Sequence, residues 1–261
     1  MIGQEKLIEK LNSYTLQTLP RTVLLIGDTG SGRHTIINQL AINLNADVVE
    51  LSEDVTSEDI IFYRQCPITT FYIIDLNKFN EKQQNQFLKF IEEPSASSYI
   101  FLIAKSEIGI LSTILNRCIK FYLEQYSEEQ LRQIANYDNS LVYRVCKTPG
   151  QLKNISEQSI LYTYNLCYTM ISKFSKANIS NAISIETKIN YKEEYSKIDF
   201  DIFFKMLKYV AFKEYILNNS IESFKIYKFT VEYTKNLLNT SLAKENFMIN
   251  YLISLRDELC A

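Results

Sequence analysis

A glycine-rich loop at residues 27–35 has the residue types and spacing that could do chemistry. It follows a short apolar run and reads Gly27-Asp28-Thr29-Gly30-Ser31-Gly32-Arg33-His34-Thr35. Its glycines match the phosphate-loop pattern G-x-x-x-x-G-K-[ST], in which backbone N–H groups surround a phosphate at the N-terminus of a helix. The strand-turn-helix context indicates descent from a phosphate-binding loop. The alternative is a glycine-rich turn without a ligand.

The last two positions of the loop depart from this pattern. Arg33 stands where the pattern has Lys, and its planar guanidinium is bulkier than an ammonium group. His34 stands where a Ser or Thr hydroxyl would bind Mg²⁺, and Thr35 comes one position late. We therefore expect weak nucleotide binding or none, no competent ATP hydrolysis and no metal site.

Asp75 ends an apolar run, an arrangement that places a carboxylate near the metal of a nucleotide hydrolase. ATPases that bind nucleotide with such a phosphate loop and a strand-end Asp have Glu at the next position when they are active. That Glu orients the attacking water, but this chain has Leu76 there. The catalytic base is therefore predicted to be missing. Asp75 is either a remnant of the metal site or an acid that caps a helix or anchors a loop.

Five short apolar and β-branched runs alternate with helical stretches up to residue 122, a pattern typical of parallel βαβ units. The expected strands are 22–26, 47–51, 70–75, 99–103 and 118–122. Helical spacing takes over beyond them, and Ser127 with Gln130 forms a predicted capping box. The expected helices there include 131–134, 139–146, 157–174, 200–217, 221–238 and 244–259, with a loop or hinge at 175–198.

Composition excludes several classes of protein. The formal net charge is −2, so the chain does not resemble a stand-alone nucleic-acid binder. Its five cysteines are scattered, which argues against a disulfide framework and a thiolate zinc site. No apolar run approaches the roughly 18 residues of a membrane span, and the N-terminus lacks the pattern of a signal peptide. We expect a cytoplasmic protein without a membrane partner.

Two further segments resemble a known family. Residues 85–94, Asn-Gln-Phe-Leu-Lys-Phe-Ile-Glu-Glu-Pro, are similar to "Asn-Ala-Leu-Leu-Lys-x-Leu-Glu-Glu-Pro" of bacterial clamp-loader subunits. Spacing alone indicates only an amphipathic helix stopped by Pro94. Residues 113–118, Thr-Ile-Leu-Asn-Arg-Cys, resemble the family motif "Thr-Ile-x-Ser-Arg-Cys", with Asn116 in place of Ser. The chain thus resembles the delta-prime subunits of DNA polymerase III clamp loaders, AAA+ proteins related to the gamma and tau subunits.

The resemblance implies a role for Arg117. In that family the corresponding Arg is an arginine finger, which reaches toward the γ-phosphate bound by a neighbouring subunit. The alternative for an Arg before a strand is a surface ion pair of little energetic value. Gly150 stands where ATP-binding relatives have a sensor Arg, so it would be a further lost nucleotide contact. The zinc module of many relatives is missing, since residues 43–70 contain only Cys66.

The implied architecture is an α/β P-loop AAA+ domain at 1–122 with a five-stranded parallel sheet, a helical lid at 123–165 and an all-α C-terminal collar domain at 166–261. The implied function is that of a non-hydrolysing stator. Its partners would be the gamma or tau and delta subunits, and, through the complex, the sliding clamp and primer-template DNA. No cofactor of its own is required, because ATP and Mg²⁺ would lie at the partner's interface. The alternatives are a catalytically active clamp-loader ATPase and an AAA+-like adaptor outside replication.

Overall fold

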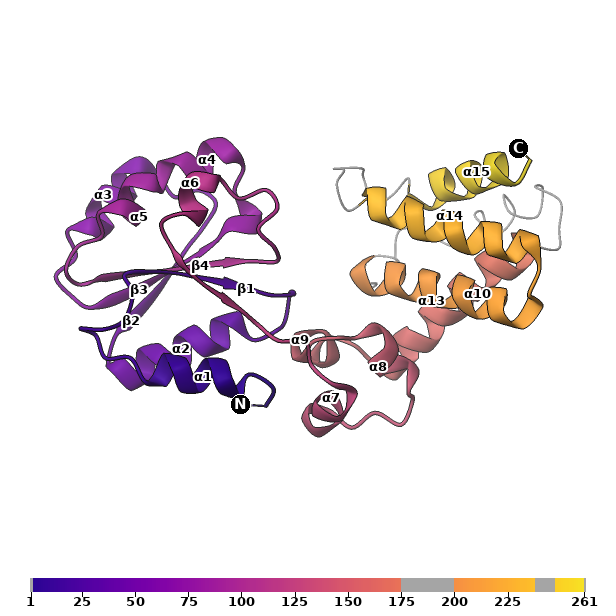
Figure 1. Ribbon diagram of the computed structural model, residues 1–261, viewed down its shortest axis with the longest axis horizontal. Helices are drawn as coiled ribbons and strands as arrows, with labels where there is room; N and C mark the ends of the chain where they lie inside the picture. The colour runs from indigo at the N-terminus through magenta and orange to yellow at the C-terminus, as the bar shows by residue number, and fades with distance from the viewer. Residues whose placement is uncertain (1, 175–199, 238–246, 261) are drawn as a thin grey trace. The chain divides into compact units, whose positions relative to one another are not determined.

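The computed structural model of the protein describes residues 2–174, 200–237 and 247–260 (Figure 1). The chain forms two compact units. Unit 1 comprises Met1–Asn136 with Lys147–Asn154, and unit 2 comprises Tyr137–Cys146 with Ile155–Ala261. The predicted domain boundaries at residues 122 and 165 stay predictions.

Unit 1 contains a sheet of five parallel strands, as the sequence predicts. These are β1 (Thr22–Ile26), β2 (Asp47–Leu51), β3 (Thr70–Asp75), β4 (Ser98–Ala104) and β5 (Ile119–Tyr122), in the order β2-β3-β4-β1-β5. The first three match the expected bounds. Strand β4 extends one residue further at each end, because Ser98 pairs with Thr70 and Ala104 pairs with Ile26.

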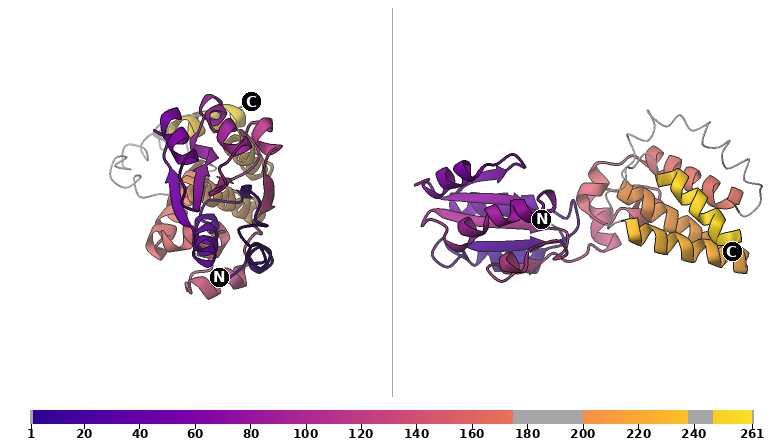
Figure 2. Two further views of the ribbon diagram at one scale, coloured as in Figure 1. Left: turned by 90° about the vertical axis from the view of Figure 1, so that its left-hand side faces the viewer. Right: turned by 90° about the horizontal axis from the view of Figure 1, so that it is seen from above.

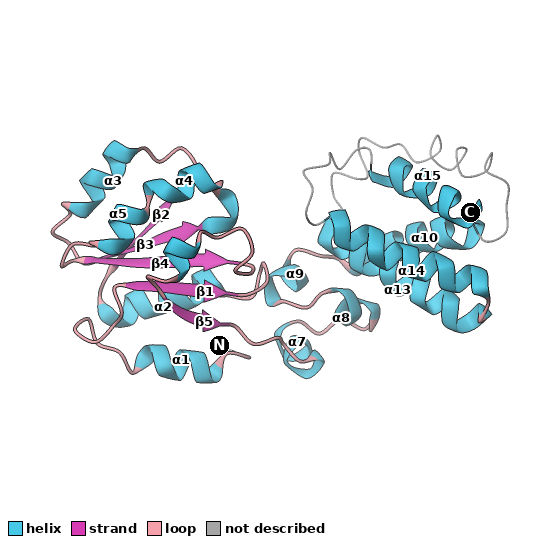
Figure 3. Cartoon of the chain, turned by 45° about the horizontal axis from the view of Figure 1, so that its top comes forward, coloured by secondary structure: helices cyan, strands magenta, loops and turns pink. Residues whose placement is uncertain are grey.

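Helices cover both faces of this sheet (Figures 1 and 3). On one face lie α1 (Glu5–Asn12) and α2 (Arg33–Leu44); on the other lie α3 (Ser57–Arg64), α4 (Glu81–Gln86), α5 (Leu88–Glu92) and α6 (Ser112–Leu115). Alternate residues of a strand pack on opposite faces of the sheet, since successive side chains point in opposite directions. Val23 and Leu25 pack in the core beneath α1 and α2, whereas Leu24 and Ile26 pack in the core on the other face.

The helix expected before Pro94 is divided in two. Phe87 separates α4 from α5, and its N–H donates to the Gln84 carbonyl at 3.1 Å, one residue short of the α-helical partner. The Phe87 ring is fully buried and packs edge-on against Phe79. Core packing of this ring accompanies the break, which periodicity could not reveal.

Two short helices complete unit 1, α7 (Glu128–Ile134) and α9 (Pro149–Lys153). The predicted capping box of α7 is confirmed, since Ser127 accepts from the N–H of Gln130 and the Gln130 side chain accepts from the N–H of Ser127. Residues 147–150, Lys-Thr-Pro-Gly, are expected from the sequence to close the predicted helix at 139–146, but they lead into α9 instead. Thr148 caps this helix and Pro149 is its first residue, a position where the missing N–H costs nothing.

Unit 2 is helical throughout its described residues outside short connections. Its helices are α8 (Leu141–Val145), α10 (Glu157–Phe174), α13 (Phe200–Asn218), α14 (Ile221–Leu237) and α15 (Phe247–Cys260). Helices α10, α13 and α14 lie side by side (Figures 1 and 2). The expected loop at 175–198 and the expected helix start at 244–246 lie outside the described residues.

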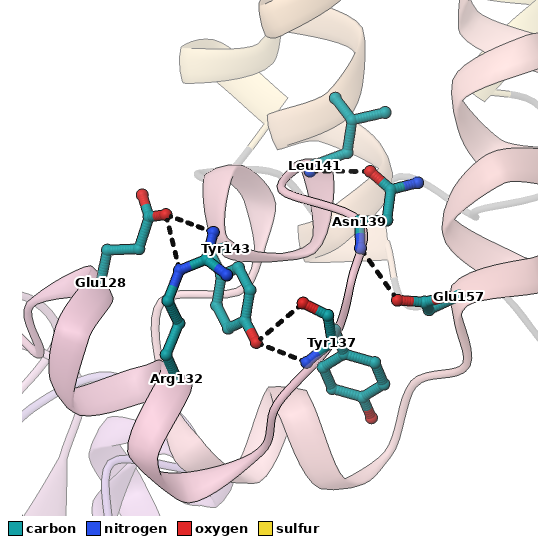
Figure 4. Close-up of polar contacts among 7 residues, drawn as sticks. All are labelled: Glu128, Arg132, Tyr137, Asn139, Leu141, Tyr143 and Glu157. Carbon is teal, nitrogen blue, oxygen red and sulfur yellow. Dashed lines mark hydrogen bonds and ion pairs between the residues drawn. The ribbon is translucent and has the colours of Figure 1, made fainter.

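Polar contacts fix the short segment that opens unit 2 (Figure 4). The Tyr137 N–H donates to the Tyr143 hydroxyl at 2.6 Å, and the Asn139 N–H donates to Glu157 Oε1 at 3.0 Å. Asn139 also accepts from the N–H of Leu141 at the start of α8.

Among the described helices, none combines the length and the apolar composition that a membrane span requires.

Candidate functional site

The glycine-rich loop lies at the carboxyl edge of the sheet, between β1 and α2. Gly30 and Gly32 have φ of +81° and +98°, a conformation that glycine adopts without steric cost. A cavity of about 790 Å³ opens beside the loop. Its lining includes the predicted site residues Gly30, Gly32, Arg33, His34, Thr35 and Asp75, and it does not include Gly27 or Arg117.

Arg33 is buried in this site, with only 5% of its surface exposed. Its Nη1 has no hydrogen-bond partner among the described residues, and the same holds for the buried hydroxyl of Ser31. Burial lowers the pKa of the Arg33 guanidinium, whereas the nearby carboxylates of Asp75 and Asp28 act to raise it. A guanidinium stays protonated in proteins, so Arg33, which lines the cavity, is a desolvated cation with an unpaired donor, whereas Ser31 does not line the cavity. The Arg33 cation fits an oxyanion.

The same loop does not fit Mg²⁺. His34 Nε2 lies 3.5 Å from Glu50 Oε1 and supplies no hydroxyl. Asp75 Oδ1 accepts from the backbone N–H of Asn77 at 3.1 Å and thereby caps the short 3-10 helix η1 (Leu76–Lys78). Leu76 is buried with 2% exposure. In the described parts of the chain no group of three or more His, Cys, Asp or Glu residues could hold a metal ion.

Three hydrogen bonds from later parts of unit 1 hold the loop. The Gly150 N–H donates to the Gly30 carbonyl at 2.9 Å, the Thr148 hydroxyl donates to the Thr29 carbonyl at 2.8 Å, and the Tyr126 hydroxyl donates to the Ser31 carbonyl at 2.8 Å. The sequence pointed to Gly150 only as a lost contact. Thr148 carries a recognisable cap signal before Pro149, but nothing in the sequence shows what its hydroxyl contacts.

The approach of α9 to the loop requires glycine at position 150. A Cβ atom there would lie 2.5 Å from the Gly30 Cα, a backbone atom that cannot move aside cheaply. We expect Gly150→Ala to lower the free energy of unfolding of unit 1 by about 1–3 kcal/mol, in the range of overpacked sites. Urea unfolding measures this change. Lys153→Ala, on the exposed side of the same helix, is the matched control, and equal stability of the two variants would contradict the close approach.

Arg117 lies away from the loop cavity, after α6 and before β5. Its side chain is 39% exposed, its Nε lies 2.6 Å from Glu92 Oε1, and its Nη1 donates to the Thr113 carbonyl at 2.8 Å. The surface ion pair considered from the sequence is therefore present. The side chain stays partly exposed despite these contacts, so the ion pair does not exclude an interaction with a second molecule.

Comparisons with known proteins bear on this site. Residues 45–127, which include Asp75, Glu92 and Arg117, match the family model described as "DNA polymerase III, delta subunit". The DNA polymerase III subunit delta' of Buchnera aphidicola is 24% identical to this chain over 190 residues. The resemblance to delta-prime subunits is confirmed. The match covers 69% of this chain but only 57% of the relative, and the family match does not include the loop at 27–35.

Solved structures give a looser likeness. A DNA polymerase III gamma subunit-related protein of Thermotoga maritima is 16% identical, with a TM-score of 0.48, over 98% of this chain and 99% of that protein. The Holliday junction branch migration motor RuvB of the same organism is 18% identical, with a TM-score of 0.47, over 82% and 76%. The α/β domain and following helices expected for the delta-prime resemblance rest on the strand order and helices described above.

Proposed function

We propose that this chain is a non-hydrolysing stator subunit of a DNA polymerase III clamp loader and supplies Arg117 in trans to a neighbouring ATPase subunit. The observation that carries the proposal is the partly exposed side chain of Arg117, which lies within the family-matched segment and outside the chain's own loop cavity. An arginine placed in this way can act on a phosphate that another subunit binds.

The chain's own loop supports the same assignment. It retains a cation and glycines that fit an oxyanion but departs from the motif at the positions that bind Mg²⁺ and orient water. Thr148, Gly150 and Tyr126 hold the loop through its carbonyl oxygens. The loop is therefore a scaffold, which binds nucleotide weakly or not at all and requires no cofactor of its own.

In the proposed complex the chain joins gamma or tau and delta subunits in the cytoplasm. The assembly opens a sliding clamp and places it on primer-template DNA, with ATP and Mg²⁺ bound by the neighbouring ATPase subunits. Arg117 stabilises negative charge that develops on the transferred phosphoryl group at one such site. Its contribution is electrostatic and requires no proton transfer.

Exposed apolar side chains on β5, which follows Arg117, and in the loop before α6 are candidates for a subunit interface. Ile108 is 86% exposed, and Ile119 and Tyr122 on the edge strand β5 are 50% and 59% exposed. The charges between them are satisfied, because Glu107 accepts from both the Lys120 ammonium and the Tyr122 hydroxyl. In the proposed assembly a protein partner covers these apolar side chains.

Reconstitution tests the proposed assembly. The chain mixed with the ATPase and delta subunits is expected to elute with them from gel filtration as one complex. Ile108→Asp places a charge in the proposed interface and is expected to weaken assembly about tenfold, the effect of a central interface residue. Ile42→Asp is the matched control, since Ile42 is 73% exposed on α2. A chain that never co-elutes, or equal effects of the two substitutions, would contradict this interface.

A further inference from the structure

Two segments that are distant in the sequence meet at Arg117. Glu92 is the last residue of α5, and Arg117 follows α6. Their side chains form an ion pair with Arg117 Nε 2.6 Å from Glu92 Oε1. The acidic end of the segment before Pro94 therefore contacts the arginine proposed to act on the neighbouring subunit's phosphate.

The backbone on both sides of this ion pair is fixed by the core. Ile91, which precedes Glu92, and Ile114 of α6 are 3% and 0% exposed and belong to one buried cluster. The Arg117 N–H donates to the Ile114 carbonyl at 3.0 Å and closes the turn after α6. Because both backbones are anchored, the ion pair restrains the side chains more than a pair between two mobile surface segments would.

The contacts engage part of the guanidinium, and the side chain as a whole stays 39% exposed. Glu92 and the Thr113 carbonyl are the polar partners of Arg117 among the described residues, and they engage Nε and Nη1. A guanidinium has five N–H donors, so donors remain for a phosphate oxygen. A long side chain held in one orientation loses less conformational freedom when it binds in a transition state.

We propose that Glu92 is a positioning residue that orients Arg117 toward the neighbouring subunit's nucleotide. This inference rests on the proposed function of Arg117. Glu92 touches neither the nucleotide nor the reacting atoms and acts only through the guanidinium. The neighbouring residue Glu93 pairs with a different arginine, since its Oε2 lies 3.4 Å from Arg64 Nη2. Glu93 therefore provides a comparison within the same segment.

The test is Glu92→Gln in the reconstituted clamp loader, with DNA-stimulated phosphate release as the measure of ATP hydrolysis. The part of kcat that depends on Arg117 is expected to fall about 5-fold, the upper range for an exposed ion pair, while the KM for ATP and the assembly stay unchanged. Glu93→Gln is expected to leave kcat unchanged. Glu92→Asp, which keeps the charge on a shorter side chain, is expected to retain part of the activity.

A double substitution separates positioning from a general structural effect. If Glu92 acts through the guanidinium, adding Glu92→Gln to Arg117→Ala changes the rate no further. An unchanged or faster rate in Glu92→Gln, together with a slow Arg117→Ala variant, would overturn the positioning role and leave the proposed function intact. A normal rate in Arg117→Ala would overturn both. If the losses of rate in the two single variants add up in the double variant, Glu92 contributes to the fold and not to the position of Arg117.

Discussion

Replacing Arg117 by Ala is expected to slow ATP hydrolysis at the neighbouring subunit's site by roughly 10³-fold or more, the range found for arginine fingers. The guanidinium acts on charge that develops in the transition state, so its loss lowers kcat rather than nucleotide affinity. Arg117 is exposed and makes two polar contacts with its own chain, so the fold should tolerate the substitution.

The measurement compares wild-type and variant chains reconstituted with their partner subunits, clamp and primer-template DNA. Gel filtration reports assembly, and phosphate release reports hydrolysis. In a loader with several active sites, the total rate of ATP hydrolysis falls only by the contribution of the site at this one interface, unless the sites depend on each other. Arg64→Ala is the matched control, because Arg64 also pairs with a glutamate of the segment before Pro94. An unchanged rate of ATP hydrolysis in an intact complex with Arg117→Ala would indicate that Arg117 is an ordinary surface charge.

The second large effect concerns the isolated chain, which is expected to show no ATP turnover in a steady-state assay. Against the motif, Arg33 stands at the position of the phosphate-binding Lys, His34 at that of the hydroxyl that binds Mg²⁺, and Leu76 at that of the Glu that orients water. Removing one group that stabilises the transition state costs about 10²- to 10³-fold in kcat, so their combined absence leaves no measurable rate. Leu76 itself is buried in the hydrophobic core and is not among the residues that line the loop cavity.

Phosphate release by the purified chain with ATP and Mg²⁺ is the measurement, and the ATPase subunit of the same loader is the positive control. Turnover near 1 per second that disappears on Asp75→Ala would contradict the stator proposal and favour an active ATPase. Contaminating activity would survive that substitution, so Asp75→Ala distinguishes the two sources.

Much of the secondary structure was predictable because it depends on local patterns. Buried parallel strands read as continuous apolar runs, and for this reason the bounds of β1, β2 and β3 agree with the structure. Ser127 and Gln130 satisfy each other's backbone groups within one turn, so their capping box was also recognisable. Motif spacing alone identifies Arg33, His34 and Leu76 as departures from the catalytic pattern, and the loss of activity that they imply stays a prediction.

Contacts between distant segments depended on the tertiary structure. Neither Gly30 nor Gly150 indicates by its type that the two backbones meet, and the Glu-Glu-Pro segment does not reveal that Glu92 pairs with Arg117 while Glu93 pairs with Arg64. The break at Phe87 likewise accompanies the packing of its ring against Phe79. The sequence by itself predicted the strands and most helices and showed which residues depart from the catalytic motif, because local hydrogen bonding and residue chemistry decide both. Only the fold decided which side chain holds Arg117, because that choice depends on how α5 and α6 pack in a shared core.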